Sequence, residues 1–154
     1  MREKMILFLA TGFGLGRIPV APGTFGTLSG IPLIFVMERL ADFPGMLAFF
    51  MVALILAGVW IAHEAELILD CKDPGCIVID EMAGYCVAMS LVPTTPLTLV
   101  AGFAAFRCFD ILKPLPVRWF EKTFAGGAGV MLDDIMAGGL AALLLKLMVL
   151  AGIL

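Results

Sequence analysis

The chain has 154 residues, of which 62% are hydrophobic and only 15% charged, and its mean hydropathy is +1.08. Soluble globular domains carry about 25% charged residues, so this composition excludes an ordinary soluble protein and indicates an integral membrane protein. The net charge is −3 and no block of basic residues is present, so nucleic acid is not an expected partner. The length predicts a single membrane domain over residues 1–154.

The apolar segments predict an all-α, multi-pass helical bundle, because a helix that crosses a bilayer needs about 20 mostly apolar residues. The N-terminus has no cleavage site of the signal-peptide type, so we expect it to be retained. Pro19 and Pro22 interrupt the first uncharged window, which predicts a broken or re-entrant segment near the N-terminus. Pro93 and Pro96 divide a later window in the same way, since proline removes a backbone donor and favours a turn. About four to five helices are expected, in the segments 25–40, 43–62, 77–92, 97–113 and 135–154.

The distribution of basic residues predicts how this bundle is oriented. If every segment crosses or nearly crosses the membrane, the N-terminus and the loops 11–24, 63–80 and 107–134 share one face. Basic loops stay in the cytoplasm, so this face is expected there. Eight of the ten Lys and Arg residues lie on it: Arg2, Lys4, Arg17, Lys72, Arg107, Lys113, Arg118 and Lys122.

The orientation depends on the turn at Pro93 and Pro96. One straight helix over 82–106 would place Glu81 and Asp110 on opposite sides of the membrane, and a shared site would be impossible. The stretches "IDEMAG" (79–84) and "DDIMAG" (133–138) are similar, but the similarity is short, and we do not interpret them as a duplication.

Acidic residues are concentrated at the ends of the predicted helices. Asp80-Glu81 and Asp133-Asp134 each begin an apolar helix, where the backbone dipole and free N–H groups favour negative charge. Helix capping is therefore an alternative explanation for one acid of each pair. Asp110 does not fit that explanation, because it lies near the C-terminal end of its helix, where the dipole repels an anion.

A cation is expected beside Asp110. Arg107 and Lys113 stand three residues away on either side and can form plain salt bridges. A divalent ion is the other possibility. The five clustered acids offer only oxygen ligands, without histidine or cysteine, and such a set suits Mg²⁺ rather than zinc. They are Asp80, Glu81, Asp110, Asp133 and Asp134.

A hard cation beside arginine and lysine is typical of phosphate chemistry. The glycine-rich stretches 11–17 and 21–27 lead into a helix and offer backbone N–H groups to an anion, although neither fits a nucleotide-binding P-loop. Other phosphatase mechanisms lack their residues, because no Cys-x₅-Arg motif is present and His63 is the only histidine. Direct attack by metal-activated water, with a carboxylate as base, remains.

Four motifs resemble the phosphatidylglycerophosphatase A family of bacterial lipid phosphatases, in the family's order and spacing across nearly the whole chain. They are "GRIPVAPGTFGTLSGIPL" (16–33), "KDPGCIVIDEMAGY" (72–85), "FRCFDILKPLPVRWFE" (106–121) and "GGAGVMLDDIMAGG" (126–139). The resemblance implies a Mg²⁺-dependent, multi-helical enzyme of the bacterial inner membrane. It implies hydrolysis of phosphatidylglycerophosphate to phosphatidylglycerol and inorganic phosphate on the cytoplasmic side.

The resemblance also implies roles for individual residues. The five acids above match motif positions of metal ligands or the base, and Arg107, Lys113 and Arg118 match phosphate-binding groups. Thr24 belongs to the first motif and is expected to contact phosphate. Asp73 belongs to the second, where a turn formed by Asp-Pro-Gly is the favoured interpretation.

Alternatives remain open at this point. A small transporter would use the acids to line a cation pathway, but it would need them near the middle of the membrane, whereas they lie at helix ends. A non-catalytic assembly subunit would leave the acids and cations without a purpose. Both a monomer and a homodimer are compatible with the sequence.

Overall fold

The computed structural model describes the backbone of all 154 residues and every side chain except those of Pro116, Glu121 and Lys122. The predicted all-α class is confirmed, and no strand occurs in the described backbone. The helices are α1 (Arg2–Ala10), the 3₁₀ turn η1 (Leu15–Arg17), α2 (Pro22–Ser29), α3 (Ile31–Ala41), α4 (Met46–Leu69), α5 (Ile79–Met89), α6 (Pro96–Leu112), α7 (Leu115–Thr123) and α8 (Gly127–Leu150).

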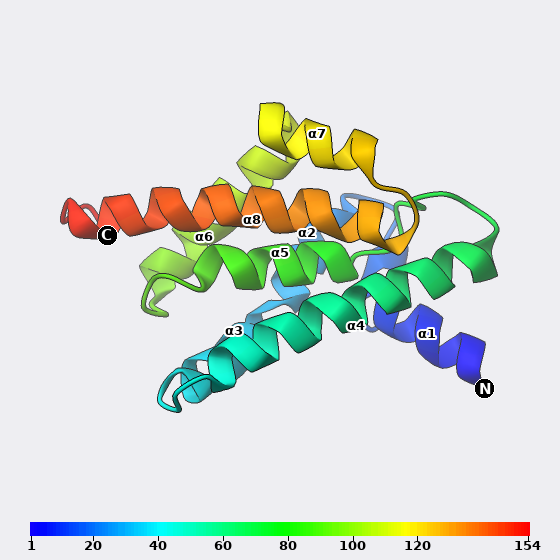
Figure 1. Cartoon of the computed structure of the whole chain (residues 1–154), viewed down its shortest axis with the longest axis horizontal. Helices are drawn as coiled ribbons and strands as arrows, with labels where there is room; N and C mark the ends of the chain where they lie inside the picture. The colour runs from blue at the N-terminus through cyan, green and yellow to red at the C-terminus, as the bar shows by residue number, and fades with distance from the viewer.

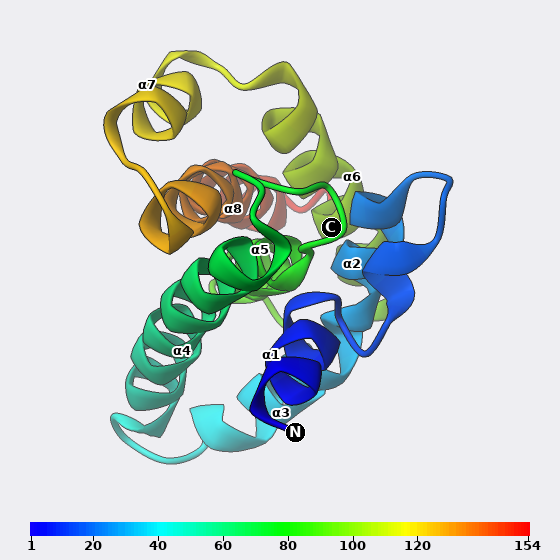
Figure 2. The same ribbon diagram turned by 90° about the vertical axis from the view of Figure 1, so that its right-hand side faces the viewer.

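Helices α5 and α8 run side by side in the same direction through the centre of the bundle (Figure 1). Figure 2, which looks from the end where both helices begin, shows α5 in the middle, with α8, α4 and α2 around it. Tyr85 of α5 and Phe106 of α6 are fully buried, with their rings stacked at 6.4 Å. Leu145 of α8 belongs to the same apolar core.

The turn predicted at Pro93 and Pro96 is present between α5 and α6. Thr95 caps α6: its side chain accepts the backbone N–H of Thr98, and the Thr98 side chain accepts the backbone N–H of Thr95. This reciprocal arrangement satisfies two backbone donors that a helix start otherwise leaves open. The turn brings the end of α6 back to the end of the bundle where α5 begins.

Several boundaries differ from the sequence prediction: α1 lies outside the expected segments, and α4 extends to Leu69, past the expected end at 62. The segment expected at 25–40 is divided at Gly30 into α2 and α3. The expected loop 107–134 contains α7, a short helix that lies beside α8 (Figure 1). Helix α8 begins at Gly127 rather than near 135, and its first residue packs so closely on α4 that a Cβ would meet the carbonyl oxygen of Val59. Asp133 and Asp134 therefore lie in the second turn of α8, and the prediction that they begin a helix was wrong.

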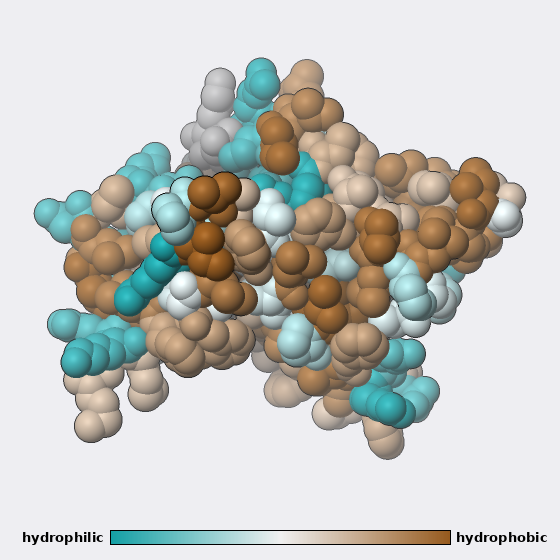
Figure 3. Space-filling model, turned by 180° about the vertical axis from the view of Figure 1, so that it is seen from behind, coloured by the Kyte–Doolittle hydropathy of each residue, from teal (hydrophilic) through white to brown (hydrophobic). Residues whose placement is uncertain are grey.

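Helices α4 and α8, with 24 residues each, are long and apolar enough to cross a membrane. Only 17% of the most apolar window of α4 is buried by the rest of the chain, so its side chains need another apolar environment. Helix α5 has 11 residues and extends about 16 Å, roughly half of a hydrocarbon layer. Figure 3 shows apolar surface over much of the middle and the right-hand end of one face, with hydrophilic side chains gathered at the left, the lower right and the upper edge.

Candidate active site

Three carboxylates meet where α5 and α8 begin. Asp80 and Glu81 lie in the first turn of α5, and Asp134 lies in the second turn of α8. Because the two helices are parallel neighbours, their acidic turns come together, and one oxygen from each acid lies within 4.8 Å of the others. We call these three residues the acid triad. Asp80 is 8% exposed and Asp134 is 4% exposed, so the triad is withdrawn from solvent.

The triad has negative charge that the described side chains do not satisfy. Asp80 Oδ1, Glu81 Oε2 and Asp134 Oδ2 are buried without a hydrogen-bond partner among the described atoms. Burial raises the pKa of Asp80 well above its ordinary value, and the charges of Glu81 and Asp134 raise it further. Burial also raises the pKa of Glu81, which a hydrogen bond with Asp80 and the charge of Arg107 partly offset. Buried, unpartnered carboxylate oxygens at this spacing fit a hard divalent cation.

Arg107 of α6 joins the triad to Asp110. Its Nη1 atom lies 2.6 Å from Asp110 Oδ2 and 3.9 Å from Glu81 Oε1. Neither ion pair has hydrogen-bond geometry, and Nη1 has no hydrogen-bond partner among the described atoms. Glu81 lies near the start of the α5–α6 hairpin and Asp110 near its end, and both form an ion pair with Arg107. The predicted turn requires these two ends of the hairpin to lie together. Arg107 retains N–H capacity for an additional anion.

The first turn of α2 covers this cation. A Cβ added to Gly23 would lie 2.5 Å from Glu81 Oε1 and 2.9 Å from Arg107 Nη1, so any larger residue would force one of these side chains to shift. The neighbouring Thr24 is half-buried in the same turn. Residues 22–24 of the first motif are thus placed against Glu81 and Arg107, as expected for part of one site.

Asp133 faces a different group from its neighbour Asp134. Its Oδ2 atom accepts a hydrogen bond from Lys113 Nζ at 2.9 Å. Lys113 ends α6 in a left-handed conformation that directs the chain into α7. Of the predicted site residues, the structure thus places Asp80, Glu81, Asp134, Arg107 and Asp110 in one group and pairs Lys113 with Asp133 beside it.

Asp133 lines a cavity of about 140 Å³ with two acids that the sequence prediction did not include. Glu66, near the end of α4, is 9% exposed, and its Oε1 atom accepts the backbone N–H of Asp73 at 2.7 Å. Asp73 does lie in the expected turn, with φ of 46°, but it also lines the cavity. The only signal for Asp73 was its place in a motif. Glu66 gave none, because burial of one helix-end glutamate depends on tertiary packing.

Arg118 is exposed on α7, and no ion pair between it and the triad is present in the part of the chain with described side chains. His63 is also exposed and lies against Gly126 and Gly127 at the start of α8. The expected phosphate-binding role of Arg118 therefore has no contact to support it in this conformation.

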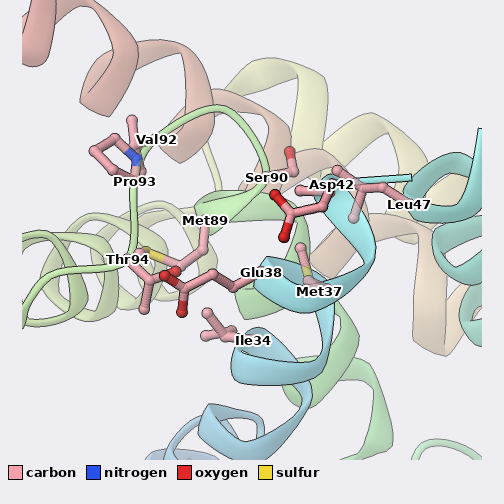
Figure 4. Close-up of a pocket in the computed structure, with 11 residues that line it drawn as sticks. Ile34, Met37, Glu38, Asp42, Leu47, Met89, Ser90, Val92, Pro93 and Thr94 are labelled. Carbon is pink, nitrogen blue, oxygen red and sulfur yellow. The ribbon is translucent and has the colours of Figure 1, made fainter. Parts of the chain in front are cut away.

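A larger cavity of about 310 Å³ lies at the opposite end of the bundle, beside the turn between α5 and α6 (Figure 4). Glu38 and Asp42 of the α3 end face Ser90 and Thr94 across it. Both acids are exposed, so ordinary solvation accounts for them. The buried, unpartnered oxygens make the acid triad the better candidate for chemistry.

Comparison of the sequence with known proteins finds a matching family. A family model described as phosphatidylglycerophosphatase A matches residues 8–149, which include every site residue named above. A protein of that name from Escherichia coli K12 is 41% identical over 136 residues, covering 87% of this chain and 77% of the relative. One from Haemophilus influenzae Rd is 37% identical over 133 residues, covering 86% and 81%.

A third relative differs in name. This Bacteroides thetaiotaomicron protein carries the provisional name of a phosphatidylinositol-3-phosphatase and is 40% identical over 138 residues, which cover 86% of each chain. No solved structure matches the chain.

Proposed function

Because the chain belongs to the phosphatidylglycerophosphatase A family, we propose that it is a Mg²⁺-dependent phosphatase that converts phosphatidylglycerophosphate to phosphatidylglycerol and inorganic phosphate. The observation that carries the proposal is the acid triad with its three unpartnered oxygens. An enzyme that handles a dianionic phosphate needs positive charge at the reacting group. In this chain, Arg107 supplies part of it.

The acid triad would hold Mg²⁺. Asp110 is linked to this group by its ion pair with Arg107 and would add a further negative charge beside the ion. Bound there, the ion would neutralise charge on the phosphoryl oxygens and lower the pKa of a water molecule. This donor set of carboxylate oxygens suits Mg²⁺ and offers nothing that would favour a softer metal.

The remaining residues bind and orient the phosphate. Arg107 has an N–H group without a hydrogen-bond partner and lies against the bare backbone of Gly23, where it can donate to a phosphoryl oxygen. Thr24 is placed in the same turn to add a hydroxyl donor. A carboxylate of the cluster takes the proton of the attacking water, and the glycerol oxygen leaves with a proton as phosphatidylglycerol. Burial of the triad keeps bulk water from competing for these charges.

We further propose that the site opens toward the cytoplasm in the bacterial inner membrane. The helix ends that carry the triad lie at the end of the bundle where the basic loops are also found, and α4 and α8 supply the apolar length. Cysteine labelling of Lys72 and Arg39 positions in intact cells tests this: Lys72→Cys should be protected from an impermeant reagent and Arg39→Cys modified. The reverse pattern would contradict it.

Phosphate release by purified protein in detergent tests the activity. Phosphatidylglycerophosphate should release phosphate with Mg²⁺ and none with a chelator, whereas Asp80→Asn and Asp134→Asn should reduce release to background in folded protein. Glu38→Gln, which changes an exposed acid at the opposite end, should behave like the unaltered chain. Full turnover in both Asn variants would overturn the metal assignment. Phosphatidylinositol 3-phosphate belongs in the same assay, because one relative carries that name.

A further inference from the structure

An apolar groove of about 170 Å³ lies between α2, α3, α5 and α6. It is lined by Leu28, Ile31, Tyr85, Leu99, Val100 and Phe103. The one polar group among these side chains is already satisfied, because the Tyr85 hydroxyl donates to the backbone carbonyl of Leu99 at 2.8 Å. The groove therefore presents hydrocarbon alone to whatever occupies it.

Residues that line the groove share faces of α5 and α6 with residues of the candidate active site. On α5, Tyr85 follows Glu81 by four residues, and on α6, Phe103 and Val100 precede Arg107 by four and seven. Residues at these spacings share one face of a helix, and four residues advance it by about 6 Å. On α2, a Cβ added to Gly23 would meet Arg107, and Leu28, five residues later, lines the groove. Helices α5 and α6 thus place the groove within about one to two turns of the acidic cluster.

We propose that this groove holds the first part of an acyl chain of the lipid substrate while the phosphomonoester lies at the acid triad. This inference rests on the proposed phosphatase function. A phospholipid joins a charged headgroup to its acyl chains by a short covalent link. In the same way, the apolar groove lies a short distance from the charged acid triad. The groove is smaller than the ~300 Å³ at which pockets for complete ligands begin, so it accommodates a portion of one chain.

The groove is open on its outer side, where Val100 is 69% exposed and Leu28 43%. Apolar surface also covers the middle of the molecule in Figure 3, so a lipid can enter sideways from a bilayer. Membrane lipid is as apolar as the groove, and burial there adds little affinity. The groove acts instead by orienting the headgroup toward Arg107 and the triad.

Filling the groove tests this role. Val100→Phe adds volume at the open wall, and Val52→Phe makes the same change on α4, outside the groove, at a side chain that is 57% exposed. Each variant is assayed with dioleoyl phosphatidylglycerophosphate in detergent micelles and with the deacylated, water-soluble headgroup. Val100→Phe should lower kcat/KM for the lipid about tenfold, as expected for lost orientation, and leave the deacylated compound unchanged.

The two substrates separate the possible failures. An unchanged ratio of the two kcat/KM values in Val100→Phe overturns the groove proposal, as does an equal fall in Val52→Phe, which would indicate a general effect of the lipid surface. If the unaltered chain hydrolyses neither compound, the proposed phosphatase function fails instead.

Photolabelling tests the groove without turnover. Phosphatidylglycerophosphate with a diazirine near the start of one acyl chain should label 28–31 and 99–103, and unlabelled phosphatidylglycerophosphate should compete better than phosphatidylcholine. Equal competition by both lipids, or labelling elsewhere, would show that bulk lipid or a second copy of the chain occupies the groove, and either result overturns the proposal.

Discussion

Gly84 of α5 and Gly138 of α8 meet backbone to backbone, so closely that a Cβ on Gly138 would collide with the carbonyl oxygen of Gly84. Asp80 precedes Gly84 by four residues, and Asp134 precedes Gly138 by four. Because residues four apart share a helix face, the two acids lie one turn above this contact and face each other. The absence of two side chains thus brings the charges of the acid triad within reach of one ion.

Gly138→Ala should force α5 and α8 apart. The added methyl group meets backbone, which cannot move aside as a side chain can, so we expect a loss of about 1–3 kcal/mol in stability and a weaker response to Mg²⁺. Thermal unfolding in detergent with and without Mg²⁺ measures both. Gly139→Ala is the matched control, because a Cβ there has no atom within 4 Å. Equal behaviour of the two variants would contradict the role of the crossing.

Asp134→Asn should separate stability from metal binding. Without metal, the substitution removes one of three crowded charges, so the melting temperature should rise. With Mg²⁺, the unaltered protein should gain about 2.7 kcal/mol at about 100 times the Kd, and the variant should gain much less. Thermal unfolding over a Mg²⁺ series checks this. A lower melting temperature without metal would mean that Asp134 has a stabilising partner.

Gly23→Ala should damage the site but not the helix. Alanine favours a helix by about 1 kcal/mol over glycine, so the protein should be as stable or more stable. The methyl group would displace Glu81 or Arg107, and kcat/KM should fall about tenfold. Parallel measurements of melting temperature and phosphate release decide the matter. Unchanged activity would show that Arg107 can shift without loss.

Arg107→Ala and Arg118→Ala should differ sharply. Arg107 contacts Glu81 and Asp110, and loss of a preorganised donor to the phosphate costs about 100-fold in kcat. Arg118 is exposed, where water and salt screen its charge, so its loss should cost about threefold at most. Steady-state kinetics compares the two. An equal loss in Arg118→Ala would show that α7 moves over the cluster during turnover.

Local chemistry made part of this arrangement predictable. Proline at 93 and 96 removes backbone donors, and this alone predicts the turn that brings Glu81 and Asp110 to one end. The five acids also stood out, because few charges occur in so apolar a chain. The similarity of "IDEMAG" and "DDIMAG" was undervalued: aligned on Asp80 and Asp134, both read Asp-x-Met-Ala-Gly, and these are the segments that cross.

Tertiary contacts decided the rest. The segment before residue 135 was expected to be a loop, but α8 begins at Gly127, which packs closely on α4. Helix α7 carries charged residues and is too short for a spanning segment, so hydropathy did not reveal it. Glu66 is buried at the end of α4, where its side chain accepts the backbone N–H of Asp73 from the following turn.

The hairpin of α5 and α6 also bears on how the chain enters a membrane. Residues 82–106, between Glu81 and Arg107, include no charged side chain, and Thr98 Oγ1 donates to the carbonyl of Pro93 at the tip. The hairpin can therefore enter the membrane tip first, from the side where its acids remain, and no charged side chain has to cross the lipid. The carbonyl of Pro93 also keeps a hydrogen-bond donor inside the lipid. The segment that carries Asp80, Glu81 and Arg107 thus needs no translocated domain to reach its place.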